Sequence, residues 1–180
     1  MHRLGIDTGF LSSLGPMFLR QIYKAIPSCP AGFGYVWEEP DGRVLGFIAC
    51  TESTGRVYKQ SLLRRGLLMA FPLLRFVFRP SFVKRMIHTL RYPSQVGDDL
   101  PPAEVLSVAV SSDSRGKGVG RAVMSAAFEE FKRRGIVDIK VAVWAENEAG
   151  NAYYRKCGFE LAAVREHHGL EMNVYVRHLP

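Results

Sequence analysis

A strand-like apolar segment at residues 105–110 leads through a glycine-rich turn into a long amphipathic helix, and this succession constrains the chain more than any other feature. Gly116, Gly118 and Gly120 fill three of five positions in the turn. Glycine permits positive φ and close approach to a ligand, and the first helical turn offers unpaired N–H groups and a positive dipole end. The pattern predicts a cradle for an anionic group such as a pyrophosphate. A tight turn without a ligand is the alternative.

A chain of 180 residues that is 47% hydrophobic is long enough for one substantial core and short for two, so we expect a single domain over residues 1–180. The hydrophobic periodicity predicts that this domain is of the α/β class. The expected elements are a helix at 10–26, strands at 33–38 and 44–51 joined by a Pro-Asp-Gly turn, helices at 58–70 and 73–90, a strand at 105–110, a helix at 118–134, a strand at 137–143, a helix at 147–156, and strands at 159–164 and 172–176.

Two motifs in the second half resemble the GNAT-type N-acetyltransferase superfamily. Arg115, Gly118 and Gly120 fill its acetyl-CoA signature, Gln/Arg-x-x-Gly-x-Gly/Ala. Residues 147–159 are similar to its helix motif Asn-x-x-Ala-x-x-x-Tyr-x-x-x-Gly-Phe, except that Gly150 replaces the alanine. The resemblance is best from residue 102 onward. A weaker likeness, at residues 10–20 and 90–94, is to a bacterial subgroup associated with cell-surface polysaccharide genes.

The resemblance implies the GNAT fold, a mixed and mostly antiparallel central sheet that is splayed between strands 4 and 5 and flanked by helices on both faces. In the family a first strand precedes the first helix, whereas residues 1–9 make a poor strand here. Either the sheet lacks its first strand or the chain is a shortened version of a longer one.

The resemblance also implies acetyl-CoA as the acetyl donor, CoA as the product, and no metal. The backbone of one splayed strand pairs with the pantetheine arm, the Val108 N–H is the candidate oxyanion donor, and the amides of residues 116–121 hold the pyrophosphate. The residues expected to bind the cofactor are Val108, Ala109, Val110, Arg115, Gly116, Lys117, Gly118, Val119, Gly120, Arg121, Asn147, Asn151 and Tyr154.

Tyr154, Glu104 and Val108 are the expected catalytic residues. Tyr154 matches the family position that protonates the departing thiolate, and a phenol with a pKa of about 10 stays protonated beside a thiol with a pKa of about 8.5. The alternative is an aromatic core residue, which is our interpretation of Tyr153. Glu104 stands six residues before Val110, where histone-type members carry their general base; a solvated carboxylate is its alternative. His167 and His168 are weaker candidates for the base.

Residues 53–97 contain nine basic and no acidic side chains, while the rest of the chain carries a net charge of −2. We interpret this stretch as a basic helical insertion on the acceptor side, and residues 102–180 as the acetyl-CoA-binding core. The insertion suits a lid that pairs with phosphates of a nucleotide sugar. A solvated helix pair that covers the sheet and a membrane-docking surface are alternatives. Nucleic acid is not expected, because no recognised module for it is present.

The expected activity is acetyl transfer from acetyl-CoA to the primary amine of a small molecule, such as an amino sugar or sugar nucleotide. An amine with a pKa of about 8 is substantially neutral at physiological pH, unlike a lysine at about 10.4. The alternatives are a noncatalytic acyl-CoA-binding or membrane-surface module and an enzyme that acetylates peptide or protein amines. Ribosomal-protein-type members carry a catalytic glutamate five residues before the motif asparagine, and Ala142 at that position argues against that subgroup.

Cys29, Cys50 and Cys157 are an odd number with no Cys-x-x-Cys spacing, which argues against a disulfide framework and a zinc site. The longest apolar stretch, residues 66–74, is too short to cross a membrane, and no secretory signal is visible. We therefore expect a soluble, cytoplasmic, bacterial enzyme, either a monomer or a homodimer.

Overall fold

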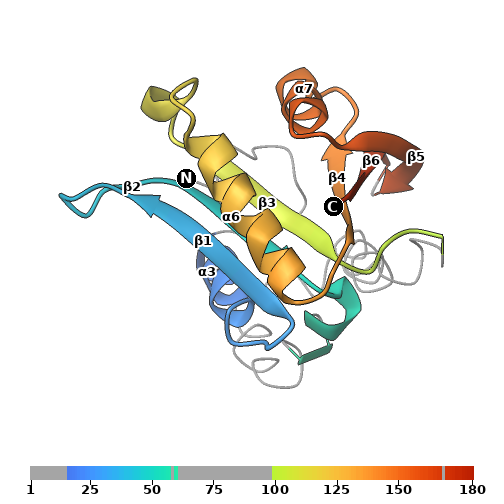
Figure 1. The fold of residues 1–180 in the computed structure, drawn as a ribbon, viewed down its shortest axis with the longest axis horizontal. Coiled ribbons are helices and arrows are strands. Elements are labelled where there is room, and N and C mark those ends of the chain that lie inside the picture. The colour runs from blue at the N-terminus through green and yellow to red at the C-terminus, as the bar shows by residue number, and fades with distance from the viewer. Residues whose placement is uncertain (1–15, 58, 61–98, 168) are drawn as a thin grey trace, which may run out of the picture.

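The computed structural model describes residues 16–57, 59–60, 99–167 and 169–180, and a six-stranded sheet lies at its centre (Figure 1). The strand order across the sheet is β1-β2-β3-β4-β6-β5. Along the chain the elements are α3 (Pro16–Ala25), β1 (Gly32–Glu38), β2 (Val44–Thr51), β3 (Glu104–Val110), the 3-10 turn η2 (Ser112–Ser114), α6 (Val119–Arg133), β4 (Asp138–Trp144), α7 (Glu148–Lys156), β5 (Glu160–His167) and β6 (Leu170–His178).

All neighbouring strands pair antiparallel except β3 and β4, which run parallel. The antiparallel neighbours keep their pairing over most of their length, whereas β3 and β4 pair only at Glu104 and Lys140, near the start of both strands. One backbone hydrogen bond, from the Lys140 N–H to the Ala103 carbonyl at 2.9 Å, accompanies this pair. The sheet is therefore two antiparallel halves that meet at one end of β3 and β4.

Glycines with positive φ stand in the β1–β2 hairpin and at both ends of α6, in the half of the sheet around β3. Gly42, with φ of 83°, closes the hairpin between β1 and β2. Gly118, with φ of 84°, is the N-cap of α6, and Gly135, with φ of 72°, follows its last turn. Residues with a Cβ rarely adopt this conformation. Glycine therefore permits the hairpin turn and the turns at the two ends of α6.

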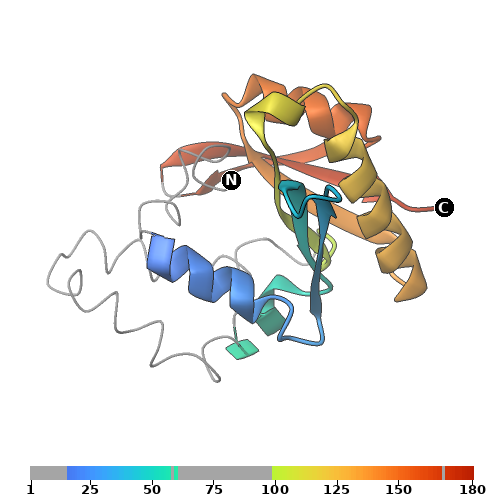
Figure 2. The same cartoon turned by 90° about the vertical axis from the view of Figure 1, so that its left-hand side faces the viewer.

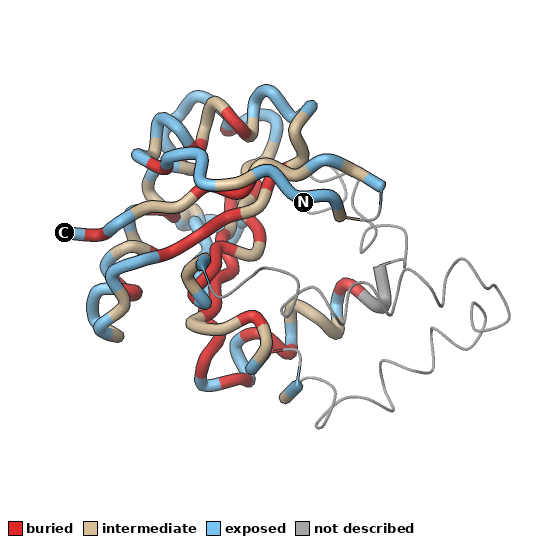
Figure 3. Tube along the Cα trace, turned by 90° about the vertical axis from the view of Figure 1, so that its right-hand side faces the viewer, coloured by how far each residue is buried: buried red, intermediate tan, exposed pale blue. Residues whose placement is uncertain are grey.

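Helices cover both faces of the sheet, as Figure 2 shows for α3 and α6. On one face α6 and α7 pack on a hydrophobic core that includes Val105, Phe131, Ile139 and Tyr154, all buried. On the other face Ile22 and Ile26, in and after α3, pack on Ala49 and Leu106 of β2 and β3. The most buried part of the trace follows the central strands between these layers (Figure 3).

The structure confirms the α+β fold class, with a mixed and mostly antiparallel sheet between helices. The hairpin strands, the glycine turn, and the helices α6 and α7 agree with the expected positions to within one or two residues. The last two strands are longer than expected, because β5 and β6 form a tight hairpin around Gly169, with φ of 78°. The expected first helix appears at Pro16–Ala25.

Several expectations lie wholly or largely outside the described residues. They are the beginning of the first helix, the first strand, and the helices at 58–70 and 73–90, so the basic insertion at 53–97 is described only at its start. Within the described part of the chain, no helix is long and apolar enough to cross a membrane.

Candidate active site

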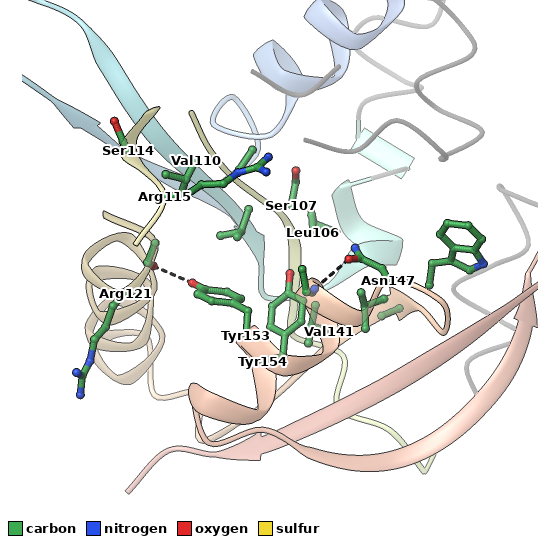
Figure 4. A pocket seen from close by; sticks show the side chains of 18 of the residues that line it. Leu106, Ser107, Val110, Ser114, Arg115, Arg121, Val141, Asn147, Tyr153 and Tyr154 are labelled. Atoms are coloured by element: carbon green, nitrogen blue, oxygen red, sulfur yellow. Dashed lines mark hydrogen bonds between the residues drawn. The ribbon is translucent and has the colours of Figure 1, made fainter. Parts of the chain in front are cut away.

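A cavity of about 650 Å³ lies between β3 and β4, beyond the single pair that joins them (Figure 4). Its lining comes from β3 (Leu106, Ser107, Val108, Ala109, Val110), from the turn and the start of α6 (Ser114, Arg115, Gly116, Gly118, Gly120, Arg121), from β4 (Val141, Ala142, Val143, Trp144), from α7 and its N-cap (Asn147, Ala149, Gly150, Tyr153, Tyr154), and from β6 (Met172). The glycine turn and the motif helix, 27 or more positions apart in sequence, thus share one site.

The backbone groups of Val108 and Val110 face this cavity. The Ser111 N–H donates to the Leu45 carbonyl of β2 at 2.8 Å, which marks that pair as hydrogen-bonded. In an antiparallel ladder such pairs alternate with pairs whose N–H and C=O groups point the opposite way. Val110 lies opposite Gly46 and Val108 lies opposite Ile48, so both belong to non-hydrogen-bonded pairs of the β2–β3 ladder. Their N–H groups point away from β2, toward β4.

A bulge in β3 puts two successive side chains on the same side of the strand. Ser107 pairs with Ala49 and Val105 with Cys50, so Leu106 is the extra residue. Leu106 packs in the cluster under α3, and the Ser107 hydroxyl accepts a hydrogen bond from Tyr23 of α3 at 3.0 Å. Burial raises the pKa of Tyr23 to about 12, so this phenol remains a donor. Bulges bend a strand and end regular pairing, which fits the divergence of β3 from β4 here.

The glycine turn presents a row of unpaired amides. Gly116 and Gly118 have φ of 76° and 84°. The first α-helical bond of α6 runs from the Ala122 N–H to the Gly118 carbonyl at 3.0 Å. Amides without an acceptor among the described residues are those of Gly116, Gly118, Val119, Gly120 and Arg121. They converge beside the cavity at the positive end of the helix dipole.

The basic side chains of the turn differ in direction. Arg115 extends over the cavity, whereas Arg121 points away from it (Figure 4). Lys117 is exposed and does not belong to the lining, nor does the buried Val119 side chain. No carboxylate belongs to the lining that the described residues provide. The turn therefore combines free amides with positive charge and no competing negative charge.

The reason for glycine at position 120 is close packing, whereas at Gly116 and Gly118 it is positive φ. A Cβ at Gly120 would lie 3.3 Å from Cε2 of Tyr153 and 3.5 Å from Cγ2 of Val110. The Tyr153 hydroxyl donates to the Gly120 carbonyl at 2.7 Å. The close approach lets Tyr153 tie α7 to the first turn of α6 across the cavity, so Tyr153 is more than a core residue.

Tyr154 is buried and lines the cavity next to Tyr153, with the two ring centroids 5.2 Å apart. Its ring also meets Phe159 edge to face at 5.7 Å. Burial raises the pKa of Tyr154, with smaller contributions from Cys50, Cys157 and Glu104. The phenol is therefore a proton donor at every physiological pH, held by packing on two sides.

The two asparagines of the motif have separate roles. Asn147 caps α7, since its side-chain oxygen accepts from the Gly150 N–H at 2.9 Å, and it lines the cavity. Asn151 is buried and lies outside the lining. Its amide donates to the carbonyls of Trp144, Ala145 and Asn147, and its oxygen accepts from Asn173 and Tyr175. Asn151 holds the β4–α7 turn to β6, and the structure does not bring it to the cavity.

Glu104 does not belong to the lining either. It is buried at the start of β3, where it accepts a hydrogen bond from the Thr54 hydroxyl at 2.5 Å and lies 3.9 Å from the Lys140 ammonium nitrogen. Lys140 also donates to the Pro101 carbonyl. Burial raises the pKa of Glu104 and lowers that of Lys140. The solvated carboxylate considered from the sequence is therefore wrong; Glu104 is a buried partner of two side chains.

His167 ends β5 outside the lining, and His168 lies outside the described residues. Among the described residues no group of three or more His, Cys, Asp or Glu side chains could hold a metal ion. The three cysteines are free. The described part of the site therefore offers hydrogen-bond donors and phenols rather than metal ligands.

The sequence motifs did not identify the side of the cavity formed by Ser107, Trp144 and Met172, and Ala142 on the same side entered only as the position where one subgroup carries a glutamate. A signal was present. Side chains alternate along a strand, so once β4 is placed beside the cavity, every second residue of β4 should face the same way. The register of β4 with β6, which places Trp144 opposite Met172, was not accessible from spacing.

Comparison with known proteins gives one family. The model of the acetyltransferase (GNAT) family matches residues 10–159. A ribosomal protein bS18-alanine N-acetyltransferase of Escherichia coli (strain K12) is 32% identical over 69 residues, which are 38% of this chain and 47% of that protein. A mycothiol acetyltransferase of Kocuria rhizophila is 34% identical over 64 residues, 36% of this chain and 21% of that protein. The matches thus span about half or less of the relatives.

Solved structures agree on the fold. SsHAT superposes with a TM-score of 0.70 at 17% identity, covering 99% of this chain and 85% of that one. A PaiA N-acetyltransferase from Thermoplasma acidophilum in complex with coenzyme A superposes with a TM-score of 0.53 at 15% identity, covering 89% of this chain and 68% of that one.

Proposed function

Since the chain belongs to the acetyltransferase (GNAT) family, we propose that it transfers the acetyl group of acetyl-CoA to the primary amine of a small molecule. The donor and the acceptor bind together, and the amine attacks the thioester directly. A related fold with coenzyme A bound supports the choice of donor. The bS18-alanine and mycothiol enzymes support an amine as the acceptor.

The main support for the proposal is that two sets of unpaired backbone groups lie along one cavity. The free amides from Gly116 to Arg121 suit the pyrophosphate of CoA, with Arg115 adding charge above them. The outward-facing backbone of Val108 and Val110 suits the pantetheine amides, which pair with it as a further strand would. A cofactor held this way would place its thioester between β3 and β4, the gap that we take as the splay expected from the family resemblance.

The reaction then needs three groups. The amine nitrogen forms a bond to the thioester carbonyl carbon, and the Val108 N–H stabilises the oxyanion that develops. The C–S bond breaks, and the Tyr154 phenol donates its proton to the CoA thiolate. The new amide nitrogen loses its extra proton to water, from which the Tyr154 phenolate recovers a proton. The raised pKa of Tyr154 keeps the donor protonated before each turnover.

We propose no side chain of the described residues as general base. Glu104 is engaged by Thr54 and Lys140 outside the lining. At pH 7.0–7.5 roughly 10–25% of an amine with a pKa of about 8 is neutral, so it reacts without such a base, whereas a lysine side chain at about 10.4 is less than about 0.2% neutral and needs one. The site therefore favours amino sugars and α-amines over lysine.

Acetylation of a peptide α-amine is a second candidate, because one relative is a bS18-alanine N-acetyltransferase. Ala142 lines the cavity at the position where that subgroup carries its catalytic glutamate. The chain thus departs from that subgroup at a position that the subgroup uses for catalysis. We therefore rank the small-molecule acceptor first.

A thiol-release assay tests the proposal. The full chain is mixed with acetyl-CoA and one amine at a time. The amines are a hexosamine, spermidine, a peptide that begins with alanine, and a lysine amide that is acetylated on its α-nitrogen and free at its side chain. The proposal expects CoA release to rise at least tenfold above acetyl-CoA hydrolysis with the hexosamine. Release with the peptide alone would favour the second candidate. No stimulation by any amine, together with tight CoA binding, would favour a noncatalytic acyl-CoA-binding module.

A further inference from the structure

The cavity is lined from both faces of the sheet. Val141 and Val143 belong to the core under α6 and α7, and Cγ2 of Val143 lies 3.0 Å from an added Cβ at Gly150 of α7. Strand alternation places Ala142 and Trp144 on the opposite face. Met172 lies opposite Trp144 in β6 and shares that face. Ser107 lies there too, since it meets Tyr23 of α3.

The face under α6 and α7 is closed to a second substrate. Val123, Met124, Phe131 and Phe159 fill it with buried side chains, and Tyr153 bridges α7 to α6 at the cavity edge. An amine that attacks a thioester held between β3 and β4 must therefore arrive from the face of Ser107 and Trp144. Tyr154 then protonates the thiolate from the side that the acceptor does not use.

Trp144 and Met172 form a shelf on that face. Both are partly exposed, they are opposite each other in the β4–β6 ladder, and both line the cavity. Ala142, two residues before Trp144, lines the cavity on the same face with only a methyl side chain. An indole beside a thioether offers a broad apolar surface that accepts a flat or chair-shaped ring.

Across the gap from the shelf stands one polar group. Ser107 is buried, and its oxygen accepts from Tyr23, which itself meets Phe47 edge to face at 5.3 Å. The Ser107 proton is then free to turn toward an oxygen in the cavity. The lining that the described residues provide contains no carboxylate, so a polycation finds no counter-charge on it.

We propose that Ser107, Ala142, Trp144 and Met172 form the acceptor subsite and that it takes a 2-amino sugar, with the ring on the Trp144–Met172 shelf and a ring hydroxyl on Ser107. This inference rests on the proposed function and names its substrate class. A small number of fixed polar groups on a mostly apolar lining is the usual composition of a small-molecule site.

The chain offers a direct optical test, because it contains two tryptophans and only Trp144 lines the cavity. Trp37 is on β1, at the far edge of the sheet. Trp37→Phe leaves Trp144 as the single indole fluorophore. With CoA bound, titration with glucosamine, galactosamine or mannosamine should change its emission in a saturable manner, and spermidine should not. The matched variant Trp144→Phe, which keeps Trp37, should give no saturable change.

Kinetics provide the second readout. Trp144→Leu and Ser107→Ala should each raise the KM of the hexosamine by about three- to tenfold, with the Kd of CoA unchanged within about twofold. CoA binding and hexosamine acetylation without any response of Trp144, or an equal response to spermidine, overturn the subsite and leave the proposed function intact. Failure of the Trp37→Phe variant and of the parent to bind CoA overturns the proposed function itself.

Discussion

Substituting Gly118 by alanine separates a cofactor cradle from a simple tight turn. Gly118 and Gly135 stand at the two ends of α6 with φ of 84° and 72°, and an added Cβ meets nothing within 4 Å at either site. The two glycines therefore carry the same backbone demand on the same helix. Only Gly118 lines the cavity.

The expected cost to stability is alike at both sites. A residue with a Cβ in the left-handed region costs about 1–2 kcal/mol, part of which is recovered because alanine restricts the unfolded chain. In a domain of this size about 1 kcal/mol lowers Tm by roughly 2–4 °C. Gly118→Ala and Gly135→Ala should therefore melt at similar temperatures, slightly below the parent.

The expected effects on CoA binding differ. A methyl group at Gly118 enters the space where a phosphate oxygen would accept the turn amides. Loss of one hydrogen bond to a charged group costs about 1.5–3 kcal/mol, which is roughly a ten- to 150-fold increase in Kd. Calorimetric titration of CoA into the parent and both variants measures this directly. Equal CoA affinity in all three proteins would show that Gly118 does not contact the phosphates and that the glycines only form the turn.

Three other substitutions test particular residues. Tyr154→Phe should lower kcat by about 10²-fold or more while the Kd of CoA stays within about twofold, and an unchanged kcat would remove Tyr154 from the chemistry. Glu104→Gln should leave kcat within about threefold and the pH–rate profile above pH 6 unaltered, since Glu104 is outside the lining. A decrease in kcat of about 10²-fold, together with loss of the acidic limb of the pH–rate profile, would instead identify Glu104 as the general base. Hydrogen bonds from Arg133 and Arg134 lower the pKa of Glu130 from 4.5 to about 2, so its contribution to stability is present above pH 4.5 and is lost as the pH falls through about 2. Glu130→Gln should therefore reduce the free energy of unfolding by about 1–3 kcal/mol at pH 7, and a denaturant titration in which the difference from the parent failed to shrink at pH 3 would contradict this.

The fold was predictable where local signals agree with the tertiary structure. The alternation and the Pro-Asp-Gly turn before Val44 fixed the first hairpin, and the glycines before Val119 fixed the start of α6. The pairing of β3 with β4 at one position only and the bulge at Leu106 in the β2–β3 ladder were not predictable from periodicity. The family resemblance predicted only that the sheet is splayed between strands 4 and 5.

The site divides in the same way. Backbone-mediated features can be inferred from the motifs, and three of the predicted site residues, Val108, Gly118 and Tyr154, line the cavity. The roles of side chains whose hydrogen-bond partners are distant in sequence cannot be inferred from the motifs. Asn151 is occupied by Asn173 and Tyr175 of β6, and Glu104 is occupied by Thr54. Spacing alone cannot show that a polar residue already has its partners.

Amide chemical shifts of the isotopically labelled chain on addition of CoA report whether the glycine turn and β3 hold the cofactor. We expect saturable shifts at the amides of Gly116, Gly118, Val119, Gly120 and Val108. We expect little change at Gly42 and Gly135, which have positive φ like Gly118 but do not line the cavity. Saturating CoA that leaves the turn amides unmoved, or moves only residues away from β3 and α6, would contradict this expectation.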